Sequence, residues 1–478
     1  MDLPRFPMSV LAIASYIRKY GFQPTILDLR VQDYKNINPN EYLAIGISSI
    51  SGVSLKEALK FAKFIRKNNK KIPIIWGGVH VSFFPTQSIR NKYVDFIVKS
   101  EGEETFRELL ERIYSGKKYD DVKGTVVIKD GKPYNNPDRE FMDLNKLDLP
   151  AYDIIDISKY SEALEYFSYE SSRGCPHRCK FCYVSNFHKK RWRAKSAEKV
   201  IKELKEIVRL YNPKKIDFVE DNFFVDKKRV EKITKGIIKN KLSFKWMGFC
   251  RADYISRFDD DFMGLLRKSG CELLSIGVES GSPTMLKKIT KDITLEQVII
   301  AARKCIKHNI MPVMSFIIGT PGETKKEMYE TLDFYDKLYK VSKKLEINGL
   351  FVYAPYPGTP IYNGAIKLGY KPHTTIEGWA SWRYSDTNNT PWLNRRYKKK
   401  LETISIISRF RFFTHRISLY SKEFKKGKLK SKINLLLYDT FVPLMNINAD
   451  LRWKLRFFSY APEWKLYQNF IENKFDKR

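Results

Sequence analysis

The first 115 residues alternate short apolar runs with amphipathic helical patterns. A helical pattern covers Met8–Tyr20 and stops at Gly21, a residue type that commonly ends helices. Apolar runs typical of buried strands follow at Thr25–Leu29, Leu43–Ser49, Ile74–Trp76 and Val94–Val98. Alternation of strands and helices at this spacing predicts an open, mostly parallel α/β sheet of the Rossmann-like kind.

A different pattern closes this region. Thr125–Ile128, the Asp130-Gly131 pair and Pro133-Tyr134 predict two strands joined by a tight hairpin turn. The next residues carry several Pro and Asp and no clear periodicity. We therefore place a first domain at residues 1–135 and a linker at residues 136–164.

A second alternation begins near residue 165. Amphipathic helices such as Ala197–Tyr211 and Thr294–Lys307 separate six apolar runs, at Tyr166–Ser171, Lys215–Glu220, Lys245–Phe249, Leu273–Glu279, Met314–Ile318 and Asn348–Tyr353. Six such units predict an open, partial (β/α)6 barrel over residues 165–375, with functional residues at the C-terminal ends of its strands. Residues 376–478 lack strand patterns and are expected to form a basic α-helical region.

Charge divides unevenly along the chain. The 478 residues contain 87 Lys+Arg and 54 Asp+Glu, a formal net charge of +33. The last 84 residues, from Arg395 to Arg478, contain 21 Lys+Arg against 7 Asp+Glu. Their aromatic and basic helical pattern is explained by packing against the barrel, and it also suits an anionic membrane surface or a lipid-like substrate. No recognisable RNA-binding motif accompanies the charge, so nucleic acid is an unlikely partner.

The apolar runs are all short. None approaches the roughly 18–20 residues of a membrane-spanning helix. The first residues, Met1-Asp2-Leu3-Pro4, lack the basic and apolar regions of a secretory signal. We expect a cytoplasmic protein, with peripheral contact at the inner membrane face as an option for its basic C-terminal region.

Three of the six cysteines fall within eight residues, in the order Cys175-x3-Cys179-x2-Cys182. In a cytoplasmic protein, such a cluster indicates metal or redox chemistry. Zinc would need a fourth ligand, which His177 or His188 offers. A [4Fe–4S] cluster held by three cysteines would keep one iron open for a substrate or cofactor. The remaining cysteines have no ligand spacing and are expected to be ordinary buried thiols.

Further motifs follow the cysteine triplet, each at the end of a predicted strand. They are Asp217–Phe223, Gly277-Val278-Glu279-Ser280-Gly281, Ser315–Glu323 and Pro355–Pro360. In this order, and together with the triplet and its aromatic Phe181, they resemble the radical S-adenosylmethionine enzyme superfamily over about 200 residues.

The resemblance implies a set of ligands. Cys175, Cys179 and Cys182 would bind three irons of a [4Fe–4S] cluster, and S-adenosylmethionine would chelate the fourth iron. It also implies binding of S-adenosylmethionine by residues at the strand ends: Glu220 or Asp221 at the amine, Glu279 at the ribose or methionyl part, and Ser315, Ile317 and Gly319 along the adenine. No catalytic residue is assigned.

The first domain resembles the cobalamin-binding domain that precedes many of these enzymes. The likeness is carried by Met8–Asp28, Ile45–Ser49, Gly77-Gly78-Val79-His80 and Glu101–Thr105. It implies a weak candidate contact to cobalamin at Gly77 and Gly78. The family's domain begins with a further central strand, which Met1–Pro7 is too short to supply together with its loop. The sheet is therefore expected to be incomplete, and cobalamin binding stays open.

The resemblance implies a reductive mechanism in which a 5′-deoxyadenosyl radical forms. The expected reaction is cobalamin-dependent methylation of an unactivated carbon in a small-molecule or lipid-like substrate. Alternatives are cobalamin-independent radical cyclisation, rearrangement or methylthiolation, or an iron–sulfur electron-transfer protein without turnover. A small acidic electron donor, such as a flavodoxin or ferredoxin, would be attracted to the basic surface. The substrate and oligomeric state are not predicted.

Overall fold

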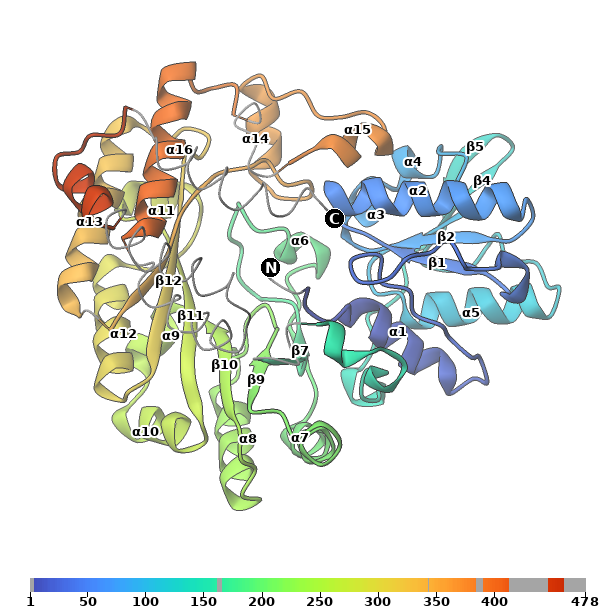
Figure 1. The fold of residues 1–478 in the computed structure, drawn as a ribbon, viewed down its shortest axis with the longest axis horizontal. Coiled ribbons are helices and arrows are strands. Elements are labelled where there is room, and N and C mark those ends of the chain that lie inside the picture. The colour runs from blue at the N-terminus through green and yellow to red at the C-terminus, as the bar shows by residue number, and fades with distance from the viewer. Residues whose placement is uncertain (1–3, 161–165, 343, 384–389, 412–445, 460–478) are drawn as a thin grey trace, which may run out of the picture.

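The computed structural model describes residues 4–160, 166–342, 344–383, 390–411 and 446–459. These residues form two main sheets, each covered by helices. The N-terminal sheet and the larger C-terminal sheet lie on opposite sides of the molecule (Figure 1). Within the described ranges, no helix combines the length and the apolar character that crossing a membrane requires.

The N-terminal sheet has five strands in the order β1-β2-β3-β4-β5. The first three are parallel, and β4 and β5 form the expected antiparallel hairpin. Helix α2 covers one face, and α1 and α5 cover the other (Figure 1). The bounds are α1 Met8–Arg18, β1 Ile45–Ser48, α2 Val53–Asn68, β2 Ile74–Gly77, β3 Phe96–Val98, α5 Glu103–Tyr114, β4 Thr125–Lys129 and β5 Lys132–Asn135.

The prediction of a strand at Thr25–Leu29 is wrong. These residues run as irregular chain and enter a turn, and β1 is the edge strand of the sheet. Thr25–Leu27 and Ala44–Ser48 line the same cavity and do not pair with one another; β1 pairs with β2 instead. A strand needs a neighbour for its backbone hydrogen bonds, and here that neighbour is missing. The sheet is incomplete, as the sequence predicts.

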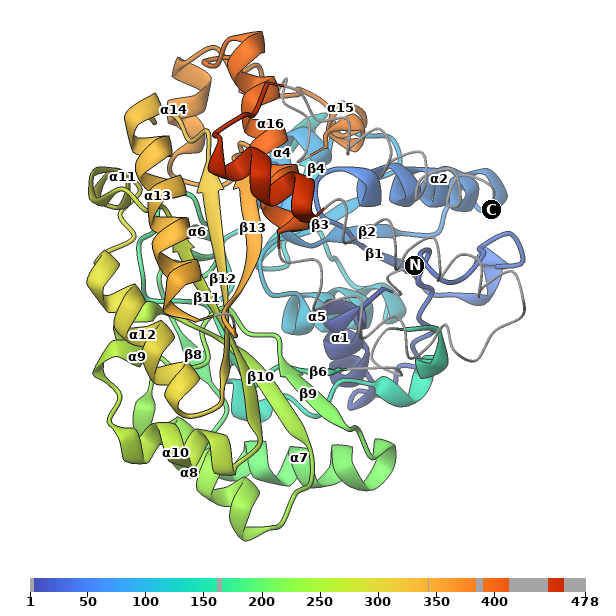
Figure 2. The same ribbon diagram turned by 60° about the vertical axis from the view of Figure 1, so that its left-hand side comes forward.

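The second sheet has six parallel strands in the order β13-β12-β11-β10-β9-β6. Its first and last strands do not pair, so it is the expected open barrel, with helices along its outer face (Figure 2). The bounds are β6 Phe167–Tyr169, α7 Ala197–Tyr211, β9 Lys215–Phe218, α8 Lys227–Lys239, β10 Lys245–Cys250, α10 Asp260–Lys268, β11 Cys271–Glu279, α12 Leu295–Lys307, β12 Met311–Ile318, α13 Lys325–Val341 and β13 Glu346–Val352.

Local chemistry fixes the helix ends. The Ser196 hydroxyl accepts the Lys199 N–H and starts α7, which ends at Asn212 in a left-handed conformation. Thr294 and Gln297 form a reciprocal capping box at the start of α12. These helices bury their apolar faces on the sheet, and the barrel core therefore lies between strands and helices.

The remaining helices and strands lie between, before or after the elements of the two sheets. Their bounds are α3 Val79–Phe83, α4 Pro85–Ser88, β7 Ser172–Arg173, α6 Val184–Phe187, β8 Arg193–Ala194, α9 Ala252–Arg257, α11 Pro283–Lys288, α14 Tyr362–Lys367, α15 Ile376–Ser381 and α16 Arg395–Phe410. Strands β7 and β8 pair with one another in an antiparallel ladder. Helices α14 and α15 pack into the core of the N-terminal domain, where Trp379 is fully buried and stacks on Phe84.

The described part of the basic C-terminal region packs on the barrel. Leu401, Ile404 and Ile407 of α16 are fully buried in the barrel core. The Arg411 guanidinium pairs with Asp336 and with Asp450, each at 3.0 Å. Packing against the barrel therefore explains the apolar stripe of α16, and these ion pairs neutralise part of the local charge.

Candidate functional site

The three clustered cysteines lie in the loop that leads from β7 to α6, and none forms a disulfide. Cys179 is buried, and Cys175 and Cys182 are half-buried. The Cys182 N–H donates to the Cys179 carbonyl at 3.2 Å, so the loop turns tightly between these two residues. Burial raises the pKa of Cys182 to about 12, with smaller contributions in the same direction from the nearby Asp221, Cys179 and Cys175.

Two side chains donate hydrogen bonds to the sulfurs of this loop. Asn222, in the loop after β9, donates its Nδ2–H to Cys175 Sγ at 3.8 Å. Arg251, directly after β10, donates its Nη1–H to Cys179 Sγ at 3.7 Å. Hydrogen bonds and positive charge stabilise thiolate over thiol, so these contacts suit Cys175 and Cys179 as thiolate ligands of a [4Fe–4S] cluster.

The described residues contain no group of three or more His, Cys, Asp and Glu side chains placed to hold one metal ion. A cubane does not need such convergence, because each thiolate binds a different iron. His177, a possible zinc ligand from the sequence, instead hydrogen-bonds the Tyr254 hydroxyl at 2.7 Å. Burial lowers the pKa of His177 to about 4, so its imidazole is neutral at pH 7.

Arg251 is a site residue that the sequence analysis missed. It is 7% exposed and its Nε–H donates to Asp253 Oδ1 at 2.8 Å. Its Nη2–H donates to the Lys291 carbonyl at 2.7 Å, which ties the loop after β11 to the cysteine loop. The sequence did contain a signal for this role, because Arg251 follows directly after a predicted barrel strand.

The structure separates the two acidic candidates at the end of β9. Glu220 is 3% exposed, its Oε1 accepts the Ser171 N–H at 2.6 Å, and its Oε2 accepts the Ser172 hydroxyl. Asp221 accepts the Gly174 N–H at 3.0 Å beside the cysteine loop, and its Oδ2 lies 3.9 Å from His188 Nε2. Burial raises the pKa of Asp221 to about 6. Glu220 is thus committed to holding β6 and β7, whereas Asp221 keeps carboxylate capacity for a cation.

Glu279 ends β11 in a left-handed conformation, with a φ of 70° at an irregularity in the pairing with β12. Its Oε1 accepts a hydrogen bond from Lys291 Nζ at 2.9 Å, and both side chains are about nine-tenths buried. Lys291 Nζ lies 5.7 Å from the centre of the Phe181 ring. In the sequence, Phe181 lies between the second and third cysteines. Glu279 is therefore connected to the cysteine loop through one buried lysine.

Along β12 the side chains alternate in burial. Met314, Phe316 and Ile318 are fully buried in the core, where Phe316 contacts Tyr335 of α13. Ser315 and Ile317 are half-buried and so face the opposite, inner side of the open barrel.

Gly319 continues from β12 with a φ of 76°, a conformation that favours glycine. The Glu323 carboxylate accepts the Gly319 N–H, and the Trp392 indole donates to the Gly319 carbonyl at 3.2 Å. Burial raises the pKa of Glu323 to about 7. Glu323 therefore stabilises the turn at Gly319. The sequence analysis included Glu323 in a motif but predicted no role for it.

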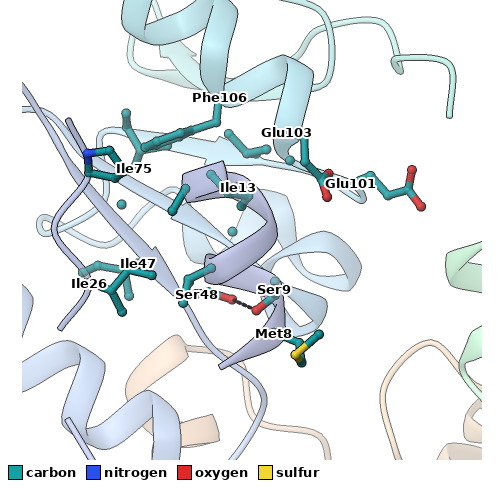
Figure 3. A pocket seen from close by; sticks show the side chains of 18 of the residues that line it. Met8, Ser9, Ile13, Ile26, Ile47, Ser48, Ile75, Glu101, Glu103 and Phe106 are labelled. Atoms are coloured by element: carbon teal, nitrogen blue, oxygen red, sulfur yellow. Dashed lines mark hydrogen bonds between the residues drawn. The ribbon is translucent and has the colours of Figure 1, made fainter. Parts of the chain in front are cut away.

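A cavity of about 650 Å³ joins the two domains (Figure 3). Its barrel wall includes Asp221 and Arg173, and its other wall consists of α1, the irregular segment around Ile26, strand β1, α5 and the loops after β1, β2 and β3. A Cβ on Gly78, whose φ is 95°, would lie 2.6 Å from the Ser49 carbonyl oxygen, so only glycine fits there. The buried hydroxyls of Ser49 and Ser100 have no hydrogen-bond partner within the part of the chain that the structure describes.

These features fit a polar-edged cofactor such as cobalamin at the strand ends. Two buried hydroxyls can each bond a ligand amide, and glycine lets the backbone approach closely. His80 does not contribute, because it is fully buried, its Nδ1 bonds the Ser51 hydroxyl at 2.9 Å, and its ring contacts Trp379. Burial lowers the pKa of His80 to about 4.

Comparison with known proteins gives two family matches. Residues 169–335 match the radical SAM superfamily, and residues 4–110 match the B12 binding domain. An uncharacterized methyltransferase of Pyrococcus horikoshii is 32% identical over 344 residues, which cover 70% of this chain and 72% of that protein. The bacteriochlorophyllide d C-12(1)-methyltransferase of Chlorobaculum tepidum is 25% identical over 362 residues, 74% of this chain and 73% of its own.

A solved structure shares the fold. The cobalamin-dependent S-adenosylmethionine radical enzyme OxsB, with aqua-cobalamin and S-adenosylmethionine bound, superposes with a TM-score of 0.70 at 22% identity. The match covers 99% of this chain and 73% of that chain.

Replacing Arg251 by Met is expected to make the midpoint potential of the reconstituted [4Fe–4S] cluster more negative. The variant removes a positive charge and a hydrogen bond to a ligand sulfur, both of which favour the reduced cluster. A redox titration followed by electron paramagnetic resonance measures the shift. Arg257→Met, at a guanidinium that is 67% exposed, is the control, and an equal shift in both variants would contradict the assignment.

Proposed function

Because the chain belongs to the radical S-adenosylmethionine enzymes that carry a B12-binding domain, we propose that it transfers a methyl group to a carbon atom of an apolar small-molecule or lipid-like substrate, with cobalamin as the methyl carrier. This membership implies a [4Fe–4S] cluster and S-adenosylmethionine, and an enzyme that needs a reductant. The observation that carries the proposal is a cavity lined both by the strand ends of the N-terminal domain and by residues that follow β6 and β9 of the barrel.

The proposed roles follow from the contacts. Cys175, Cys179 and Cys182 would hold the cluster, which would supply the electron that cleaves S-adenosylmethionine into methionine and the 5′-deoxyadenosyl radical. Asp221 takes the cationic amine of S-adenosylmethionine, because its carboxylate is the one at the end of β9 with capacity to spare. Glu220 acts instead by fixing the backbone at Ser171, which precedes the loop.

The remaining contacts to S-adenosylmethionine are proposed for the ends of β11 and β12. Glu279 lies at the ribose or methionyl part and is held in place by Lys291. Ser315 and Ile317 line the inner barrel face, and Gly319 ends that strand with a backbone turn against which a flat adenine can lie. Gly77 and Gly78 are proposed to admit cobalamin close to the backbone after β2.

An apolar substrate is supported by large side chains left exposed near the strand ends of both domains. Ile50 after β1 is 56% exposed, and Phe249 in β10 is 41% exposed. An acidic flavodoxin or ferredoxin is the proposed reductant, because the chain carries a formal charge of +33.

Membrane contact is proposed for the described part of the C-terminal region. Ile447, Leu451 and Leu455 follow one another at four-residue spacing and are 66%, 56% and 69% exposed. This spacing places them on one helical face, and the neighbouring Lys454 is also 69% exposed. An apolar stripe beside basic residues suits the surface of an anionic membrane.

Replacing Cys179 by Ala is expected to abolish both the charge-transfer absorption of the cluster and the reductive cleavage of S-adenosylmethionine. A cluster cannot be held by two of its three protein ligands in a loop of this geometry. Absorption spectra and 5′-deoxyadenosine formation under anaerobic conditions measure the two effects. Cys305→Ala, at a buried thiol remote from the loop, should retain both, and cleavage by the Cys179 variant would overturn the enzyme proposal.

Replacing Gly78 by Val is expected to weaken binding of hydroxocobalamin at least about tenfold, because the new side chain would strike the Ser49 backbone and force the loop away. Equilibrium dialysis of the wild type and the variant measures the dissociation constants. Gly131→Ala is the control, since that glycine also has a positive φ but open space around it. Wild-type protein that binds no cobalamin would defeat the methyltransferase proposal and favour cobalamin-independent radical chemistry.

The double variant Leu451→Glu/Leu455→Glu is expected to reduce binding to phosphatidylglycerol vesicles by about tenfold or more, because each buried leucine contributes roughly 1.5–3 kcal/mol. Co-sedimentation measures bound protein. Phosphatidylcholine vesicles test the charge requirement, and Ile366→Glu, at an exposed apolar residue of α14, is the matched control. Equal binding by the wild type and the double variant would exclude this surface.

A further inference from the structure

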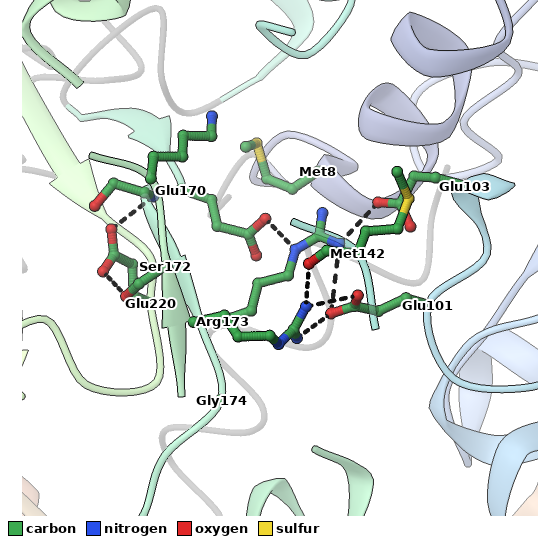
Figure 4. Close-up of polar contacts among 12 residues, drawn as sticks. Met8, Glu101, Glu103, Met142, Glu170, Ser172, Arg173, Gly174 and Glu220 are labelled. Carbon is green, nitrogen blue, oxygen red and sulfur yellow. Dashed lines mark hydrogen bonds and ion pairs between the residues drawn. The ribbon is translucent and has the colours of Figure 1, made fainter. Parts of the chain in front are cut away.

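A cluster of buried charges joins the two domains beside the cavity. It consists of Glu101 and Glu103 from the N-terminal domain and Glu170, Arg173 and Arg193 from the barrel side, and we call it the interdomain charge cluster (Figure 4). Glu101 follows β3 and Glu103 begins α5, whereas Arg173 and Arg193 face one another in the paired strands β7 and β8.

Both arginines form contacts that cross the boundary between the domains. Arg173 Nη1 lies 2.8 Å from Glu103 Oε1 and 3.7 Å from Glu101 Oε1, and its Nε–H donates to Glu170 Oε2 at 2.7 Å. Arg193 donates to both oxygens of Glu101, at 3.0 and 2.5 Å. It also donates to the Met142 carbonyl at 3.0 Å. Such bidentate pairs fix orientation as well as distance.

The cluster is shielded from solvent. The side chains of Glu103, Glu101 and Arg173 are 3%, 7% and 11% exposed. Buried ion pairs commonly contribute little net stability, because each charge loses its hydration. Separating them is unfavourable, however, since it leaves uncompensated charge. The arrangement therefore holds one geometry firmly without adding much to the stability of the fold.

Its location links the two cofactor sites. Arg173 is separated from Cys175 by a single residue, Gly174, whose N–H is bound by Asp221. Glu101 directly follows Ser100, and both residues line the cavity. Other contacts also join the domains, among them the ion pair between Arg5 and the buried Asp217 of β9 and the ring contact of Phe83 with Tyr183.

We propose that Glu103 and Arg173 are positioning residues, which fix the cysteine loop at a set distance and orientation from the strand ends of the B12-binding domain. This inference rests on the proposed function, since the two faces held in register are the sites proposed for the cluster with S-adenosylmethionine and for cobalamin. The ion pairs act on the relative placement of the two sites and not on either site alone.

The test compares Glu103→Gln with the wild type as full-length, cluster-reconstituted protein. Glu103→Asp retains the charge on a shorter side chain and serves as the conservative variant. Glu203→Gln is the matched control, because the Lys195–Glu203 pair is buried to a similar degree, at 5% and 6% exposure, and lies within the barrel. It breaks a buried ion pair without touching the boundary between the domains.

Hydrogen–deuterium exchange gives the first readout and needs no cobalamin. We expect Glu103→Gln to accelerate exchange about tenfold or more in peptides covering residues 101–106 and 172–182, with little change in the barrel helices. Glu103→Asp should fall between the wild type and Glu103→Gln. Glu203→Gln should accelerate exchange around α7 and not at the boundary. Unchanged exchange at the boundary in Glu103→Gln would overturn the proposal.

The second readout is the magnetic interaction between reduced cluster and cob(II)alamin in electron paramagnetic resonance, which depends on their separation. We expect this interaction to weaken or become heterogeneous in Glu103→Gln, while cluster content and 5′-deoxyadenosine formation stay within about twofold of the wild type. An unchanged interaction would show that the pair only stabilises the fold. Wild-type protein that binds no cobalamin would contradict the proposed function instead, and the exchange experiment would then decide the positioning role by itself.

Discussion

Parallel strand direction is the constraint on which the site depends. In the six-stranded sheet, and in β1 to β3 of the smaller sheet, every strand ends at the same edge. The N-terminal edge and the ends of β6 and β9 line one cavity, so residues separated by more than 100 positions in the sequence become neighbours. The cysteine loop, the carboxylates after β9 and β11 and the glycine pair after β2 share one region for this reason.

The contacts of the charged groups in that region distinguish residues that stabilise the fold from residues that are available to bind a cofactor. Glu220 and Asp221 are adjacent acids, yet the first is saturated by Ser171 and Ser172 and the second accepts a single backbone N–H. Arg251 places a buried cation against a ligand sulfur. Positive charge near the sulfurs and a carboxylate near the open side of the loop are complementary to an anionic cluster and a cationic methionyl amine.

The incomplete N-terminal sheet shows how pairing decides secondary structure. Thr25–Leu29 has the composition of a strand, but no strand lies beside it, and it remains irregular. The same gap leaves β1 as an edge that lines the cavity. The loops after β1, β2 and β3 still reach the cavity, because they depend on the direction of their own strands and on the packing of α2 and α5.

The sequence by itself determined most elements and the cofactor class. Apolar periodicity located all six barrel strands, and the helix over Ala197–Tyr211 to the residue, because burial on one face imposes a pattern that can be read locally. The spacing of the cysteines, with the motifs at later strand ends, indicated the radical chemistry. These features depend on residues close in the chain.

Only the tertiary structure decided which polar groups meet. The pairing of Arg173 with Glu103 and the approach of Arg251 to Cys179 join segments about 70 residues apart, and no local pattern records them. The packing of α14 and α15 into the N-terminal core is equally non-local. Burial, hydrogen-bond saturation and edge exposure are properties of the assembled chain, since each depends on which distant segment excludes water from a given side chain.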